Sequence, residues 1–134
     1  MYSSVTDMIA RFGQAEMIRL TTPPDQEMET VHADMVTRAL VEASALIDSY
    51  LRARYTVPVV DVLPEITRAA AMLARYDLSL GEAREPSEQT RLARKEVIEW
   101  LERLHDGKAV LDINTAPPGD DSFAQMADRP AVYS

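Results

Sequence analysis

The chain has 134 residues, 46% of them hydrophobic and 27% charged, with no cysteine and a formal net charge of −8. This length provides one hydrophobic core and is too short for two ordinary domains. The acidic balance argues against a general nucleic-acid binder, which neutralises phosphates with clustered Lys and Arg, and the missing cysteines exclude disulfides and thiolate chemistry.

The first residues predict two short helices followed by a rigid elbow. Ser4 and Asp7 form a capping-box pattern that opens the first helix, and Gly13 is expected to close it as a left-handed cap. A second short helix is expected to stop soon after Leu20. Pro23 and Pro24 follow there, and consecutive prolines remove backbone donors and favour extended geometry.

The longest predicted helix begins at about Glu27 or Glu29 and ends at Ala53. Its apolar residues recur at helical spacing and form a stripe broad enough to face a helical bundle. The members of this stripe are Val36, Leu40, Ala43, Ile47, Tyr50 and Leu51. We therefore expect this helix to be the spine of the fold.

Beyond the spine, the sequence predicts an extended segment and two further helices. Segment 56–60 is β-branched and interrupted by a proline, which favours an extended connector or an edge strand. Pro64 suits the first turn of a helix that ends at Gly81, and a last helix closes at Gly107. Alternation over residues 110–113 is compatible with a short strand.

The C-terminal residues are too polar and too rich in proline to pack, so we predict a flexible arm over residues 114–134. The predicted fold class is therefore all-α. It is a single domain of four or five helices over residues 1–113, with a long central helix, an extended connector loop and that C-terminal arm.

Each of the two histidines follows a glutamate by three residues, in the pairs Glu29/His32 and Glu102/His105. Two such motifs on separate helices are what a ferritin-like di-metal site needs. Both pairs, however, fall at predicted helix ends, where charged side chains complement the helix dipole. No nucleophile elbow, phosphate-binding loop or nucleotide fingerprint is present. We expect no metal, no cofactor and no catalytic residue, and hence no enzyme.

Three stretches of the chain, taken in order, resemble a known family. They are Tyr2-x-x-Val5-x-Asp7-Met8-Ile9-x-Arg11-Phe12-Gly13-x-x-Glu16, Tyr50-Leu51-Arg52-Ala53-Arg54-Tyr55-Thr56-Val57-Pro58 and Ala74-Arg75-Tyr76-x-Leu78. Together they resemble the small connector, or neck, proteins of Mu-like phages and prophages. The likeness covers roughly residues 2–113 and leaves the C-terminal tail unmatched.

The resemblance implies a structural adaptor that joins the head of a phage to its tail. Such a protein assembles as a homo-oligomeric ring between the portal and the tail-completion proteins, and DNA passes through its channel without specific binding. An acidic lumen would suit that passage because it repels phosphates. The implied location is the virion, after assembly in the bacterial host cytoplasm. No apolar run is long enough to cross a bilayer, so we expect no membrane contact.

The second stretch supplies the candidate interface. Arg52, Arg54, Tyr55 and Pro58 match the family's junction of spine and connector loop. We expect them, together with Val57, at a subunit or partner interface, with Arg54 and Tyr55 exposed. The two arginines have a second interpretation, because positive charge at the end of a helix complements its dipole. The alternative function is a small helical regulatory or peptide-binding module.

Overall fold

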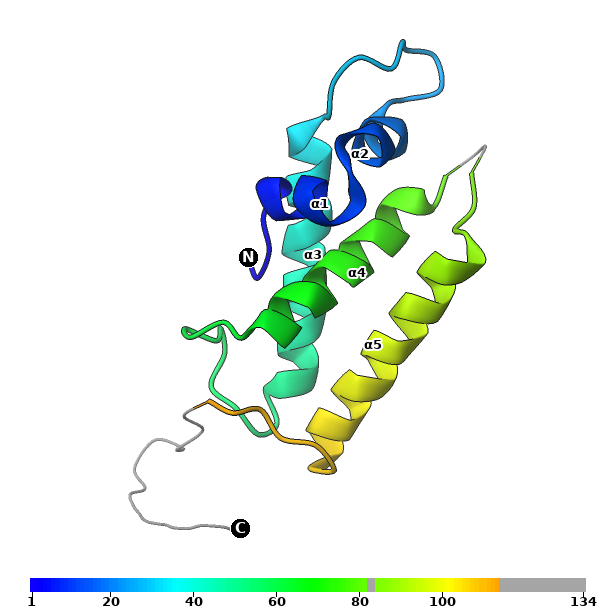
Figure 1. Ribbon diagram of the computed structural model, residues 1–134. Coiled ribbons are helices and arrows are strands. Elements are labelled where there is room, and N and C mark those ends of the chain that lie inside the picture. Colours follow the sequence, from blue (N-terminus) through cyan, green and yellow to red (C-terminus); the bar gives the residue numbers. More distant parts are fainter. Residues whose placement is uncertain (82–83, 114–134) are drawn as a thin grey trace.

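The computed structural model describes residues 1–81 and 84–113, and the predicted arm over residues 114–134 lies outside them. The described residues form five helices: α1 Val5–Phe12, α2 Gln14–Thr21, α3 Ala33–Leu51, α4 Pro64–Ser79 and α5 Glu88–Asp106 (Figure 1). The all-α fold class and the long central helix are confirmed.

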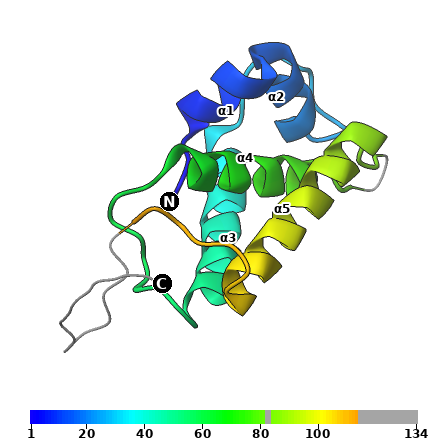
Figure 2. The same cartoon turned by 60° about the horizontal axis from the view of Figure 1, so that its bottom comes forward.

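Three long helices form the body of the molecule, and two short ones form a lobe at one end. Helix α4 packs against both α3 and α5, while α1 and α2 pack on α3 and α4 (Figure 1). Figure 2 shows α1 and α2 together on one side of α4, away from the C-terminal halves of α3 and α5. The connector loop and the residues after α5 lie at the opposite end from the α2–α3 loop.

Two of the predicted helix caps are confirmed and one differs. The Ser4 hydroxyl accepts a hydrogen bond of 3.0 Å from the Asp7 backbone N–H, and Gly107 adopts the left-handed conformation after α5. Gly13 also has a positive φ, of 92°, but its ψ of 147° lies outside the left-handed helical region. Gly13 therefore separates α1 from α2 by an abrupt change of direction.

The spine helix begins later than predicted. It starts at Ala33 and not at Glu27 or Glu29, and residues 23–32 form an irregular loop. The backbone N–H of His32 donates to the buried hydroxyl of Thr21, at 3.0 Å. This bond ties the start of α3 to the end of α2, so the acidic residues precede the helix instead of forming its first turn.

The apolar stripe of α3 faces the core as predicted. Its fully buried members are Val36, Leu40, Ala43, Ile47 and Leu51. The facing side of α4 is rich in alanine, and its small buried side chains are Ala69, Ala70, Ala71 and Ala74. Because alanine has no bulk beyond Cβ, α4 can pack closely against α3 and α5. The side chains that fill the core are mainly aliphatic.

Both short strands considered from the sequence are absent. In residues 1–81 and 84–113 the β-type pairing observed is an isolated bridge between Gly81 and Arg84. Segment 56–60 is a connector loop that bends at residues 57, 58 and 60 and has no strand pairing, and residues 110–113 form no strand either. Backbone donors of both segments find side-chain partners, which are described below.

Candidate assembly site

Tyr2 holds the middle of the connector loop. Its buried hydroxyl accepts a hydrogen bond of 2.8 Å from the backbone N–H of Val59 and donates to the carboxylate of Asp48 on α3. The backbone N–H of Tyr2 donates to Ser44 Oγ, at 2.9 Å. Burial, followed by the hydrogen bond to Asp48, raises the pKa of Tyr2 to about 12, so the phenol stays protonated at neutral pH and remains a donor.

Tyr55 plays a similar part at the end of the spine. It is buried, and its hydroxyl accepts a hydrogen bond of 2.9 Å from the backbone N–H of Leu111. The prediction that the Tyr55 side chain is exposed is therefore wrong. The phenol uses its polar group inside the molecule, where it satisfies the backbone N–H of Leu111 in place of a strand partner.

Arg54 caps a helix other than its own. Its Nε donates to the backbone carbonyl of His105, at 2.8 Å, in the last turn of α5. The guanidinium lies so close to Gly107 that a Cβ there would come within 2.8 Å of it. The dipole interaction expected for Arg54 thus exists, but it joins the spine to α5 instead of stabilising the end of α3.

The remaining predicted interface residues lie at the surface to different degrees. Arg52 and Pro58 are exposed, and Val57 is half-buried against the core. The structure therefore brings all five predicted residues to one end of the molecule. It leaves Arg52 and Pro58 as exposed candidates for contact with a partner. Arg54 is also exposed, as predicted, although its Nε is engaged within the chain, whereas Tyr55 is buried.

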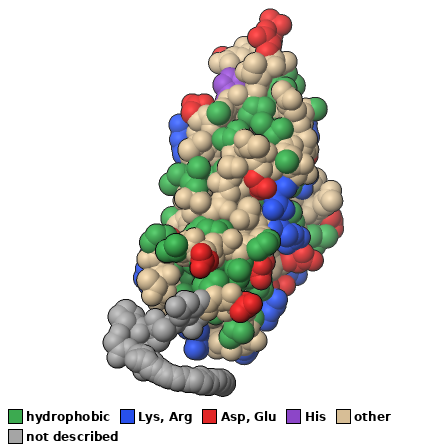
Figure 3. All heavy atoms as spheres, turned by 60° about the vertical axis from the view of Figure 1, so that its left-hand side comes forward, with side chains coloured by type: hydrophobic (Ala, Val, Ile, Leu, Met, Phe, Trp, Pro, Cys, Tyr) green, Lys and Arg blue, Asp and Glu red, His purple; other side chains and the backbone are tan. Residues whose placement is uncertain are grey.

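Sequence reasoning missed the most exposed apolar residues of this end. Val60 is 91% exposed and Val110 is 80% exposed, with Val62 also at the surface. Figure 3 shows hydrophobic side chains spread over this face of the molecule, including the end that carries the connector loop. A hollow of about 270 Å³ lies beside them, between the loop and Ile113. The sequence contained an indication of this exposure. A segment that is not helical places few of its side chains in the core, so a run of valines in it is expected to leave some of them at the surface.

The two Glu-x-x-His motifs do not come together. His32 precedes α3 at one end of the molecule, and His105 lies in the last turn of α5 at the other end (Figure 1). Within residues 1–81 and 84–113, no group of three or more His, Cys, Asp or Glu side chains is placed to hold a metal ion. Among the same residues, no helix has the length and apolarity to cross a membrane.

Comparison with known proteins identifies the family. The model of the family described as Bacteriophage Mu, Gp36 matches residues 2–127, so the likeness extends into the C-terminal tail that sequence reasoning left unmatched. Gene product J of Escherichia phage Mu is 30% identical over 136 residues, which cover 99% of this chain and 94% of that protein. The Mu-like prophage FluMu protein gp36 of Haemophilus influenzae is 28% identical over 114 residues, covering 85% and 77%. The chain belongs to the Mu Gp36 family of phage proteins.

Proposed function

We propose that this protein is a structural head–tail connector of a Mu-like phage or prophage, which assembles as a ring between the portal and the tail. The observation that carries the proposal is its likeness to gene product J of phage Mu, which spans 99% of the chain. Its location on this proposal is the virion, after assembly in the bacterial host cytoplasm. It acts by assembly and not by turnover, so it needs no cofactor.

The connector-loop end of the molecule supports an assembly role. Tyr2 and Tyr55 hold the loop and the residues after α5 in place, while the side chains of Val60 and Val110 remain outside the core. An ordered backbone that displays apolar side chains loses little conformational freedom on binding, which favours association. We infer that Arg52, Pro58 and these valines contact a neighbouring subunit, the portal or a tail-completion protein.

The charge of the protein supports passage of DNA through such a ring. A net charge of −8 per chain accumulates around a ring and opposes adhesion of phosphates to its wall. The duplex would therefore slide through the channel without sequence-specific contacts. No basic patch is required for this role, in contrast to a protein that holds DNA.

The test is to image the protein and measure its mass. Negative-stain microscopy and multi-angle light scattering on concentrated protein, alone and with the portal of the same phage, should reveal rings with a central channel. Ring formation should increase with protein concentration or on addition of portal. A chain that stays monomeric under both conditions, and that captures a peptide in its helical groove, would instead establish the binding-module alternative.

A further inference from the structure

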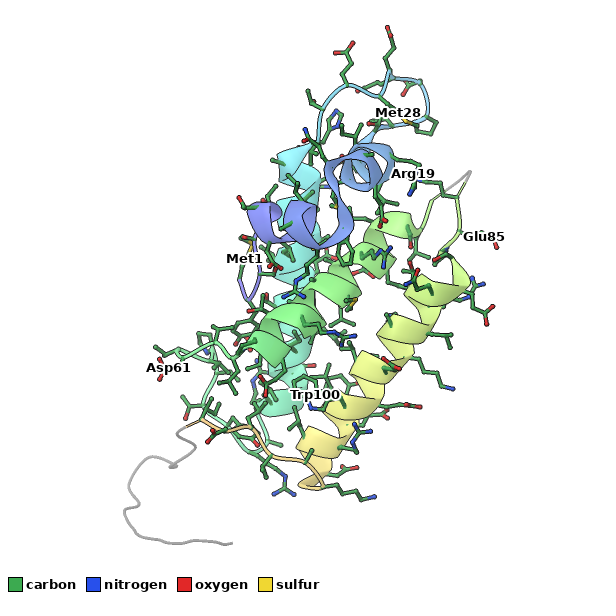
Figure 4. The ribbon with its side chains drawn as sticks, in the orientation of Figure 1. Met1, Arg19, Met28, Asp61, Glu85 and Trp100 are labelled. Atoms are coloured by element: carbon green, nitrogen blue, oxygen red, sulfur yellow. The ribbon has the colours of Figure 1, made fainter. Side chains whose placement is uncertain are left out.

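The loop between α2 and α3 is an acidic projection that the fold leaves unpaired. Residues 23–32 form it, and no Lys or Arg occurs between Arg19 and Arg38. It carries three exposed carboxylates and an exposed methionine: Asp25, Glu27, Glu29 and Met28. The ion pairs found in residues 1–81 and 84–113 include none of these carboxylates. Figure 3 shows acidic side chains at the tip of this end, and Figure 4 labels Met28 on the loop.

A groove of complementary character runs beside α5. It has a volume of about 420 Å³, and Tyr76 of α4 lines it together with residues of α5. Its apolar lining includes Leu92, which is 52% exposed, and Ile98. Its cations are Arg91, Arg94 and Lys95, against the two carboxylates of Glu88 and Glu99. These three cations fall within five residues and form the densest basic cluster of the chain.

Two of the three groove cations, Arg91 and Arg94, are held in place by contacts within the chain. The guanidinium carbon of Arg94 lies 4.8 Å from the centroid of the Tyr76 ring, a cation–π arrangement. Arg91 donates to the carbonyl of Pro86, at 2.9 Å. Both side chains are therefore oriented before any partner arrives, which reduces the conformational entropy lost when an acidic segment binds.

We propose that the acidic loop of one copy docks in the α4–α5 groove of a second copy, with Met28 on Leu92 and the loop carboxylates on the groove cations. This inference rests on the proposed ring. Loop and groove are different surfaces, so their contact is heterologous and repeats from head to tail unless two copies exchange it reciprocally. Such a contact closes into a ring when the rotation between neighbours permits it, whereas a two-fold contact would stop at a dimer. The opposite charges also speed encounter and set the register.

The absence of cysteine makes a clean cross-linking test available. Met28→Cys and Leu92→Cys are made in separate full-length chains, one of them tagged, and the two are mixed and oxidised. Because each chain has one thiol, a mixed disulfide dimer requires contact between copies. The matched control replaces Leu92→Cys with Val41→Cys, since Val41 on α3 is also 52% exposed. We expect several-fold more mixed dimer with Leu92→Cys than with the control.

Charge reversal tests the electrostatic half of the proposal. Glu27→Lys with Glu29→Lys in the loop chain should lower the cross-linking yield several-fold, and Arg91→Glu with Lys95→Glu in the groove chain should restore it. The yield of the original pair should fall as salt rises, because the Debye length shrinks from about 10 Å at 0.1 M to about 3 Å at 1 M. Yields equal to the control, or a reversal that is not rescued, would overturn the proposal.

Another occupant of the groove would give a different result. Residues 114–134 contain Asp120, Asp121, Phe123 and Met126, so the tail also has acidic and apolar groups. If the tail filled the groove, the thiol of the Leu92→Cys chain would resist alkylation in the full chain and react after removal of residues 114–134. It would also form no disulfide with the Met28→Cys chain, which would overturn loop docking.

The cross-linking result and the imaging result can fail separately. Rings that form without the loop–groove disulfide would refute this contact and leave the connector proposal intact. Failure to form rings with portal would refute the connector itself.

Discussion

Arg75 of α4 binds the carboxylate of Glu16 of α2 through two hydrogen bonds, of 2.7 and 3.0 Å. Both side chains are largely buried, at 16% and 19% exposed, and the guanidinium also lies 4.4 Å from the centroid of the Phe12 ring. The contact fastens the α1–α2 lobe to the body of the molecule. It also joins two of the stretches that resemble the family, since Glu16 belongs to the first and Arg75 to the third.

We predict that this ion pair is strongly coupled. In a double-mutant cycle of Glu16→Ala and Arg75→Ala, the coupling free energy should be about 1 to 3 kcal/mol, because a bidentate pair shielded from water is screened little. The control cycle uses Asp7 and Arg11, whose side chains are joined by one hydrogen bond and are 28% and 30% exposed. This pair should have a coupling free energy of about 0.3 to 0.5 kcal/mol. Urea unfolding measures both, and equal coupling in the two cycles would contradict the prediction.

The Tyr2 phenol should make stability sensitive to alkaline pH. The pKa of Tyr2 is raised in the fold from 10.0 to about 12. The stabilisation that the protonated phenol gives to the fold is therefore complete below pH 10 and is lost as the pH rises toward 12. Tyr2→Phe removes the hydroxyl that serves both Val59 and Asp48, and should cost about 1 to 3 kcal/mol at pH 7.

The pH dependence is measured by denaturant unfolding between pH 8 and 12. The difference in unfolding free energy between wild type and Tyr2→Phe separates the effect of the Tyr2 phenol from that of other groups that titrate in this pH range. That difference should shrink as the pH rises above 10. Tyr50→Phe on the half-buried face of α3 is the control and should change stability little. A difference that stays constant to pH 12 would show that Tyr2 does not titrate as argued.

The helical stripes were predictable because they depend on neighbours in sequence. Leu51 follows Ile47 by four residues, and both are fully buried. Tyr55 continues the same spacing, yet periodicity reports only the side of a helix on which a residue lies. It does not report which distant segment meets that side. The bonds from Tyr55 to Leu111 and from Arg54 to His105 join residues more than 50 positions apart, so they required the tertiary structure.

The start of the spine illustrates the same limit. Acidic residues before an apolar stripe favour the positive end of a helix, which led to the prediction of a start at Glu27 or Glu29. In the fold, Thr21 accepts a hydrogen bond from the backbone of His32, and this tertiary contact overrides the local preference. Exposure was predicted correctly for Arg54, but Tyr55, which was also expected at the surface, is buried.

The aliphatic core should be sensitive to truncation at predicted positions. Leu51→Ala and Leu73→Ala should each lower the free energy of unfolding by about 2 to 5 kcal/mol, because both side chains are almost fully buried between α3 and α4 and each change leaves a cavity. Leu92→Ala is the matched control, since Leu92 is half exposed, and should cost less than about 0.5 kcal/mol. Thermal or urea unfolding measures the change in unfolding free energy for each variant. Similar losses of stability at all three sites would refute the assignment of the core.

At the connector-loop end, folding and assembly should respond to different residues. Tyr55→Phe leaves the N–H of Leu111 without its acceptor and should destabilise the monomer by about 1 to 3 kcal/mol. Val60→Asp should change monomer stability by less than about 0.5 kcal/mol, because this side chain is exposed and makes little contact with the core. If Val60 contacts a partner, the same change buries a charge in the assembled ring and weakens association.

Two measurements on the same samples separate these effects. Hydrogen exchange should find the amides of Val59 and Leu111 protected in the wild-type monomer, and Tyr55→Phe should expose Leu111 without affecting Val59. Light scattering with portal should find assembly reduced by Val60→Asp. The control Val41→Asp on α3 should spare assembly, because that site lies outside both the connector loop and the α4–α5 groove. If Val60→Asp assembles as well as Val41→Asp does, the apolar end of the connector loop is not a contact surface.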